Sequence, residues 1–226
     1  MTEELETLKT IESLKAYQPL LDDFSSKSLA DRRKKFFEEI LPEYWGLFHR
    51  RTNAYLAAKG KELPNYDVGI FLVGLSEIPV LFSVASLCPQ KIHFIFTPES
   101  ESTLNVVEKG IGVINSELQG LIKSAGRHPI NNMAKLYNGT QNELSSILHE
   151  CQDQKIALDI TGGKKSMICA VVRSPATRTC DLYYVDFLRY EKNRGRPVLG
   201  TEFMTCLTST GSVEAFIDEK KEWLQN

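Results

Sequence analysis

The sequence predicts an α/β protein with a doubly wound, mainly parallel sheet and a helical extension at its N-terminus. After residue 64, short apolar runs alternate with helix-like segments, which is typical of strands buried on both faces of a parallel sheet. Before that point the apolar residues follow a helical period without strand-like runs. We therefore expect a helical extension over residues 1–62 and an α/β domain over residues 63–226.

The N-terminal portion predicts three helices. Apolar residues recur every three positions from Leu5 to Tyr17, as in an amphipathic helix. A second helix is expected from about Ser28 until Pro42 interrupts it, and a third from Glu43 to Ala58.

The remaining sequence predicts strands and helices in alternation. The run that begins at Val68 is followed by Ser76 at a helix N-cap position and by Pro79 in the first helical turn. Thr140 and Glu143 have the spacing of a capping box that opens a helix ending at Glu150. The expected strands are residues 68–73, 91–96, a segment within 132–137, 155–160 and 181–186, and the other helices are residues 80–87, 103–123 and 164–172.

Composition excludes several functional classes. The chain has 27 Lys and Arg against 29 Asp and Glu, a net charge of −2, so bulk positive charge does not drive binding to nucleic acid. The five cysteines form no CxxC pair and the four histidines have no metal-ligand spacing, so we expect no metal and no cofactor. The acidic start lacks a secretory pattern and no segment resembles a membrane span, which favours a cytoplasmic location.

Two strand-to-helix corners are candidates for a ligand site. Ligands of open parallel sheets bind beyond the carboxyl ends of the strands, where helix N-termini present free N–H groups. The first corner contains Gly74, Leu75 and Ser76. The second corner runs from Thr161 through two glycines and two lysines, a combination that suits a phosphate-bearing ligand; its members are Thr161, Gly162, Gly163, Lys164 and Lys165.

Each corner also has a purely structural interpretation. A serine before a helix most often only caps it, and a Gly-Gly pair is often only a turn. Cations are disfavoured at a helix N-terminus, however, so the doubled lysine calls for a reason. Other nucleotide motifs do not fit: Leu158 replaces the first P-loop glycine, no GxGxxG follows the first strand, and the serine elbow of hydrolases lacks its second glycine.

The residues at both corners resemble a known family. Residues 71–81, FLVGLSEIPVL, are similar to the first strand and helix of the CRISPR-associated Rossmann fold (CARF) domain. Residues 159–167, DITGGKKSM, resemble the family's Asp-x-Thr-Gly-Gly-Thr-Lys-x-Met signature, with Lys164 where the family usually has threonine. Tyr184 to Asp186 and the segment 195–202 resemble the strand and hairpin that follow, so the likeness covers about residues 66–210 and implies a Rossmann-like sheet.

The resemblance implies a ligand, a partner and site residues. CARF domains form homodimers that bind cyclic oligoadenylates, the second messengers of type III CRISPR systems, most often cyclic tetra-adenylate. By position, Ser76 and Lys165 match residues that many members use at the ligand, and Thr161, Gly162 and Gly163 would lie along the phosphates. Gly74, Leu75 and Lys164 belong to the same corners, and Thr97 and Asn138, expected after the second and third strands, would contact adenine or ribose.

Three functions are compatible with this resemblance. The chain carries no HEPN-type ribonuclease motif and no nuclease domain, and stand-alone members of this kind are often ring nucleases. The first hypothesis is cleavage of cyclic tetra-adenylate by its own ribose 2′-OH, with Lys165 supplying charge and Ser76 positioning, to linear products that carry a 2′,3′-cyclic phosphate. The second is a non-catalytic sensor that signals through its N-terminal helices, whose basic clusters at residues 32–35 and 50–51 could contact DNA or a protein partner. The third is a nucleotide-binding protein outside CRISPR defence.

Overall fold

A computed structural model gives the structure of the chain and describes residues 36–188, 190–191, 196–198 and 200–207. The expected helix from Leu5 to Tyr17, the expected helix start at Ser28 and the basic cluster at residues 32–35 lie outside the described residues. Within the described part, residues 36–62 form one compact unit with Asp186–Phe203, and residues 63–185 form a second unit with 204–207. The division into domains at residues 62 and 63 stays a prediction.

The first unit is built on α3 (Leu41–Ala58), which follows a π-helical turn, Phe36–Ile40, without a break. One helix was expected to end at Pro42 and another to begin at Glu43; the structure has this change at Leu41, where the π-helical turn gives way to α3. Pro42 lies in the first turn of α3, where a missing backbone N–H removes no helical hydrogen bond. The buried Tyr44 donates a hydrogen bond to Glu202 at 2.6 Å, and β6 (Tyr190–Glu191) pairs antiparallel with β7 (Arg196–Pro197).

The central sheet has six strands in the order β3-β2-β1-β4-β5-β8, and the pairs β1–β2, β1–β4, β2–β3 and β4–β5 are parallel. The α/β, Rossmann-like fold predicted from the sequence is confirmed. The strands are β1 (Val68–Val73), β2 (Lys91–Phe96), β3 (Gly126–Pro129), β4 (Ile156–Asp159), β5 (Asp181–Phe187) and β8 (Glu202–Cys206).

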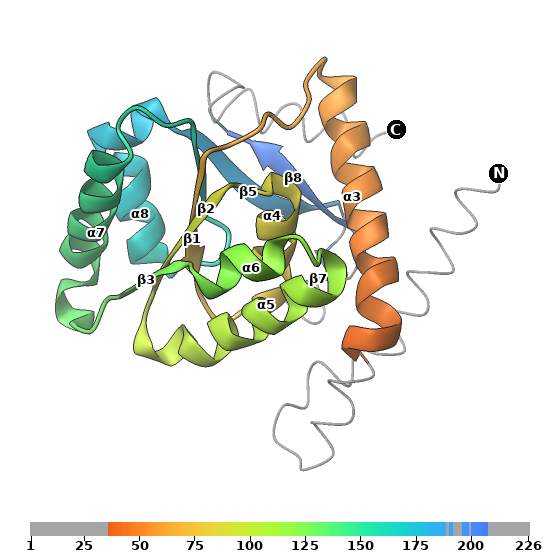
Figure 1. Cartoon of the computed structure of the whole chain (residues 1–226), viewed down its shortest axis with the longest axis horizontal. Coiled ribbons are helices and arrows are strands. Elements are labelled where there is room, and N and C mark those ends of the chain that lie inside the picture. Colours follow the sequence, from red (N-terminus) through yellow and green to blue (C-terminus); the bar gives the residue numbers. More distant parts are fainter. Residues whose placement is uncertain (1–35, 189, 192–195, 199, 208–226) are drawn as a thin grey trace, which may run out of the picture. The chain divides into compact units, whose positions relative to one another are not determined.

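Helices cover both faces of this sheet, as doubly wound topology requires (Figure 1). One layer contains α4 (Glu77–Leu87), α5 (Glu101–Ile114) and α6 (Leu118–Lys123), and the other contains α7 (Leu136–Glu150) and α8 (Lys165–Arg173). All six residues of β1 are buried, as expected for a central parallel strand. Leu72 packs with Leu144, Met167 and Val171 in the core beneath α7 and α8. No described helix is long and apolar enough to cross a membrane.

The third strand was expected within residues 132–137, and this expectation is wrong. The strand is β3, Gly126–Pro129, and the expected position holds the 3₁₀ turn Met133–Lys135 and the start of α7. β3 has only four residues and no apolar run, because it lies at the edge of the sheet and pairs with β2 through the register His93 to Gly126. Such a strand is specified by its neighbour rather than by its own periodicity.

Two expected helix boundaries also differ from the structure. α7 begins at Leu136 and not at Thr140, whose hydroxyl donates to the Leu136 carbonyl one turn back at 2.8 Å and so caps nothing. The segment expected as one helix over residues 103–123 is divided into α5 and α6. The break follows from Asn115, whose side chain accepts the Glu117 backbone N–H at 3.1 Å in a local turn.

Candidate functional site

The corner between β1 and α4 presents an uncommitted hydroxyl at a helix N-terminus. Ser76 occupies the N-cap position of α4 with extended backbone angles, φ −105° and ψ 112°, but its side chain makes no capping hydrogen bond. The side chain is exposed to solvent, and its neighbour Leu75 is 70% exposed. The sequence placed Ser76 correctly, and the structural role that most often explains such a serine is not used here.

The corner between β4 and α8 places two lysines at a second helix N-terminus. Lys164 has the N-cap position and Lys165 is the first residue of α8, close to the predicted start of this helix. Lys165 is exposed and makes no ion pair with another described residue, whereas Lys164 pairs with Glu99. Backbone N–H groups at the two helix N-termini favour an anion, so Lys165 adds positive charge where an anion is already favoured.

The two corners touch each other through their glycines. A Cβ added to Gly74 would lie 1.6 Å from the carbonyl oxygen of Gly162, and a Cβ added to Gly162 would lie 2.4 Å from the carbonyl oxygen of Leu72. Gly163 is similarly crowded, since its Cβ would lie 2.8 Å from the Leu72 side chain. None of these three glycines has a positive φ, so glycine is required here for close approach of two backbones and not for a left-handed conformation.

This contact brings Ser76 and Lys165 to one place. Ser76 is two residues from Gly74 and Lys165 is three residues from Gly162, spans of at most about 7 Å and about 11 Å along the chain. Because β1 and β4 are adjacent parallel strands, both helix N-termini open at the same edge of the sheet. The structure therefore brings the two predicted corners together at one edge of the sheet.

The buried side chain of Asp159 holds the turn of the second corner through hydrogen bonds. Asp159 has no exposed surface and accepts three hydrogen bonds, from the Thr161 backbone N–H at 3.1 Å, the Thr161 hydroxyl at 2.8 Å and the Ser83 hydroxyl at 2.9 Å. Burial raises the pKa of Asp159 to about 7, and the hydrogen bonds from Thr161 and Ser83 oppose that rise. The Thr161 hydroxyl also accepts the Val185 backbone N–H at 2.8 Å, so it holds the turn and has no hydrogen left for a ligand.

Thr97 and Asn138 occupy positions different from those of the other predicted site residues. Thr97 directly follows β2 as expected, but it is 1% exposed, and its backbone N–H donates to the Ser100 hydroxyl at 3.1 Å at the start of the turn Pro98–Ser100. Asn138 lies in the first turn of α7 and is exposed, whereas the sequence analysis placed it at the end of the third strand. That placement is wrong because β3 ends at Pro129. Ligand contacts by Thr97 and Asn138 stay predictions.

Three side chains at this candidate site were not predicted from the sequence. Ser83, within the apolar helix α4, was not distinguishable from an ordinary helical residue, although it donates to Asp159. Glu99 and Ser100 follow β2, and their importance depends on β2 lying beside β1 in the sheet. No signal in the local sequence identifies Ser83 or Glu99, while Thr97 and Ser100 in principle announce a tight turn.

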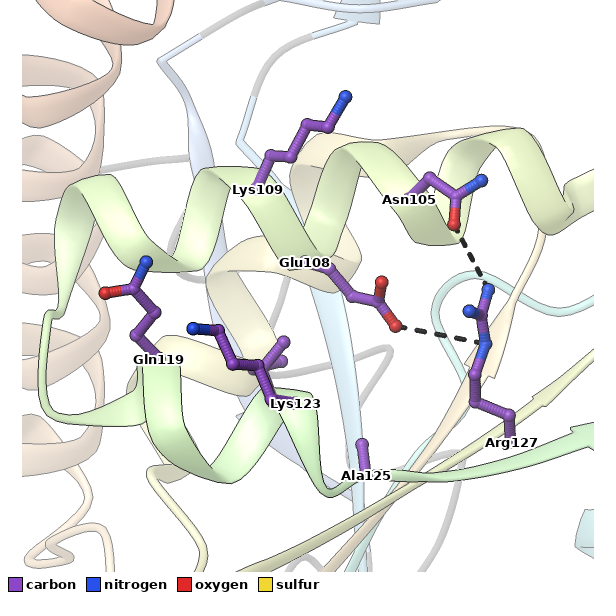
Figure 2. Close-up of a pocket in the computed structure, with 8 residues that line it drawn as sticks. Asn105, Glu108, Lys109, Gln119, Lys123, Ala125 and Arg127 are labelled. Atoms are coloured by element: carbon purple, nitrogen blue, oxygen red, sulfur yellow. Dashed lines mark hydrogen bonds and ion pairs between the residues drawn. The ribbon is translucent and has the colours of Figure 1, made fainter.

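A separate cavity of about 570 Å³ lies between α5, α6 and β3 (Figure 2). None of the predicted site residues lines it. Its arginine, Arg127, is already held by the Asn105 side chain at 3.2 Å and by Glu108 at 3.9 Å, and the Lys109 amine points away from Arg127. These contacts offset the charge of Arg127, while Lys109 and Lys123 also line the cavity. No group of three or more histidine, cysteine or acidic side chains in the described residues is arranged to hold a metal ion.

Comparisons with known proteins give distant structural similarities. No protein-family model and no curated protein matches the sequence. Among solved structures, Can2 from Sulfobacillus thermosulfidooxidans in complex with cyclic tetra-adenylate has a TM-score of 0.39 and 21% identity, over 53% of this chain and 32% of Can2. Enterococcus italicus Csm6 bound to cyclic hexa-2′-fluoro-hexa-dAMP also has a TM-score of 0.39, with 11% identity over 72% of this chain and 41% of Csm6. The chain thus spans less than half of each protein, and at these values neither likeness identifies the ligand of this chain.

Proposed function

We propose that this chain binds a cyclic oligoadenylate, most specifically cyclic tetra-adenylate, at the joined corners and cleaves it without a metal ion. The observation that supports the proposal is the contact of Gly74 with Gly162, because it joins the corners that carry Ser76 and Lys165. Neither of these side chains has a partner among the described residues. The ligand class comes from the resemblance of residues 71–81 and 159–167 to the CARF motifs.

The chemistry of the corners suits a phosphodiester. Helix N-termini offer backbone N–H donors and partial positive charge, and both α4 and α8 begin at this edge. Gly162 and Gly163 let this turn pack closely against β1, because a Cβ at either position would meet Leu72. Lys165 supplies a full charge, and the exposed Leu75 offers apolar surface for a base or for a second subunit. A dimer would place two copies of each group around a two-fold axis, which fits a closed ring of nucleotides.

The proposed reaction uses a nucleophile carried by the ligand. A ribose 2′-oxygen bonds to the adjacent phosphorus and loses its proton to solvent, while the bond from phosphorus to the 5′-oxygen breaks and its electron pair leaves with that oxygen, which takes up a proton. The product is a linear oligonucleotide with a 2′,3′-cyclic phosphate. In this proposal Ser76 holds the phosphate in line for attack, and Lys165 stabilises the negative charge that develops on its oxygens.

The alternative is a sensor that binds the ring without cleaving it and signals to a protein or DNA partner. One observation favours this alternative. The corner's carboxylate, Asp159, is fully buried and engaged by three donors, so it is not available as a base for a 2′-OH. Arg51, one of the basic residues predicted to serve a partner, lies close enough to Tyr44 and Glu202 within the first unit to influence the pKa values of both.

Incubation with cyclic tri-, tetra- and hexa-adenylate, followed by mass spectrometry and calorimetry, separates the two functions. We expect linear di-adenylate from the tetra-adenylate ring, and a loss of about 10²–10³-fold in cleavage rate for Lys165→Ala, the usual effect of removing one charge-stabilising donor. Lys109→Ala, an exposed lysine on α5, is the matched control and should cleave normally. Binding without products would favour the sensor, full activity of Lys165→Ala would contradict the assigned role, and a monomer that binds no ring would contradict the proposal itself.

A further inference from the structure

We propose that Glu99 acts as a built-in competitor for the ligand phosphate, because it pairs with Lys164 and holds this lysine away from the ligand. The ion pair between Glu99 and Lys164 is called the clasp below. A ligand that reaches Lys164 must displace Glu99, so the clasp lowers affinity and discriminates against ligands that place no phosphate there. This inference rests on the proposed binding of a phosphate-bearing ring at the joined corners.

The clasp crosses the candidate site. Glu99 follows β2 and Lys164 follows β4, and β1 lies between these two strands in the sheet. The ion pair therefore passes over the carboxyl end of β1, where Gly74 begins the first corner. A phosphate bound between the helix N-termini of α4 and α8 would lie beside it.

Hydrogen bonds hold the backbone in place at both residues of the clasp. On one side, the Ser100 hydroxyl accepts the Thr97 backbone N–H at 3.1 Å and donates to the Val73 carbonyl at 2.9 Å, which ties the turn that carries Glu99 to the end of β1. On the other side, the Lys164 carbonyl accepts the backbone N–H groups of Met167 at 2.8 Å and Ile168 at 3.0 Å. The pairing therefore follows from the fold and not from two long side chains that meet on loose loops.

The clasp is weak enough for a phosphate to open. The Lys164 side chain is 31% exposed and that of Glu99 is 59% exposed. An ion pair with this exposure changes an equilibrium constant by at most about fivefold. A phosphate oxygen that accepts a charge-assisted hydrogen bond from Lys164 competes with it effectively. Because Lys165 has no acidic partner in the part of the chain that the structure describes, we assign the two neighbouring lysines different roles. Lys165 is available at once, and Lys164 becomes available when Glu99 is displaced.

The test is a binding cycle with four proteins: wild type, Glu99→Gln, Lys164→Gln and the double variant. Each is titrated with cyclic tetra-adenylate by calorimetry, and separately with inorganic tripolyphosphate as a probe that carries phosphate without bases or a ring. Glu99→Gln keeps the shape of the side chain and removes the competing charge, so we expect about two- to fivefold tighter binding of both probes. The gain should vanish when Lys164 is also replaced, and it should shrink at high salt.

Glu150→Gln is the matched control, since it makes the same change in net charge at the exposed end of α7 and should leave both affinities unchanged. Unchanged or weaker binding by Glu99→Gln overturns the clasp, and so does an equal gain in Glu150→Gln or a gain that persists without Lys164. If no protein binds the ring, the proposed function fails, and the tripolyphosphate titrations still decide whether Glu99 restrains Lys164.

Discussion

Within the second unit, polar side chains differ between the two sides of the sheet. At the β1–β4 side, Ser76 and Lys165 stand at helix N-termini without a partner among the described residues. At the β2–β3 side the polar groups bind one another: His93 Nδ1 lies 3.0 Å from His128 Nε2, and His128 Nδ1 lies 3.2 Å from a Glu143 carboxylate oxygen.

On the β2–β3 side, burial determines the protonation state of His93. His93 is 4% exposed, and burial, assisted by the charges of Lys91 and His128, lowers its pKa to about 4. Its ring is therefore neutral near neutral pH and packs as part of the sheet. The comparison shows that the number of titratable side chains does not mark the site. The candidate site instead combines exposed polar side chains that have no partner among the described residues with two helix N-termini.

The largest expected effect follows from breaking the contact between the two corners. Gly74→Ala places a methyl group 1.6 Å from the Gly162 carbonyl oxygen, and two backbones cannot relax as a side chain does. We expect a loss of more than about 4 kcal/mol in the free energy of unfolding, at the extreme of single substitutions, together with loss of ring binding. Urea denaturation measures the first effect and calorimetry the second.

Gly120→Ala is the matched control, because this glycine of α6 has nothing within 4 Å of an added Cβ. Alanine there should be neutral or should stabilise the protein by about 0.5–1 kcal/mol, the usual gain in a helix interior. If Gly74→Ala unfolds at the same urea concentration as the wild type, the close approach of the corners is wrong.

The next effect concerns the buried carboxylate under the second corner. Burial raises the pKa of Asp159 from 3.8 to about 7, so the folded protein takes up a proton more readily than the unfolded chain. Its contribution to stability is therefore fully present below about pH 4 and is lost as the pH rises through about 7. Relative to Asp159→Asn, which cannot ionise, the wild type should lose up to about 4 kcal/mol between about pH 4 and about pH 8.

Urea denaturation of both proteins across this pH range measures the difference. Weaker hydrogen bonds to Thr161 and Ser83 shift the free energy of unfolding of Asp159→Asn by a nearly constant amount at every pH. Ionisation of Asp159, in contrast, changes the slope of the wild-type free energy of unfolding against pH. Parallel curves for the two proteins would show that the pKa of Asp159 is not raised.

The sequence predicted the positions of the two corners far better than the edge strand of the sheet, for physical reasons. Gly162 and Lys165 follow a strand whose apolar run announces burial on both faces, so sequence order alone placed them at the carboxyl edge. β3 could not be found this way, because Gly126–Pro129 carries no apolar period and exists as a strand through pairing with β2.

Long-range partners also escaped the sequence. Asp159 and Ser83 are 76 residues apart, and Lys164 and Glu99 are 65 apart, so their contacts depend on which strands are neighbours. Thr140 shows the opposite error: its capping-box spacing with Glu143 is a local pattern that the fold does not use, since α7 already begins at Leu136. Local patterns therefore predicted which residues turn the chain, and strand order determined which of them remain available to a ligand.

The smallest effect sharpens the contrast between the two sides. Glu143→Gln at the β2–β3 side makes the same chemical change as Glu99→Gln at the site, since each replaces a carboxylate paired with a basic side chain. His128 is 23% exposed and Glu143 41% exposed, and an amide oxygen can still accept a hydrogen bond from His128, so we expect a loss of less than about 1 kcal/mol in unfolding free energy. The affinity for cyclic oligoadenylate should not change, because Glu143 pairs with His128 on β3, which is separated from β1 by β2. Urea denaturation and calorimetry with cyclic tetra-adenylate are carried out on the two variants in parallel. If Glu143→Gln binds cyclic tetra-adenylate as much more tightly as Glu99→Gln does, then charge anywhere on this unit, and not the clasp, controls ligand binding.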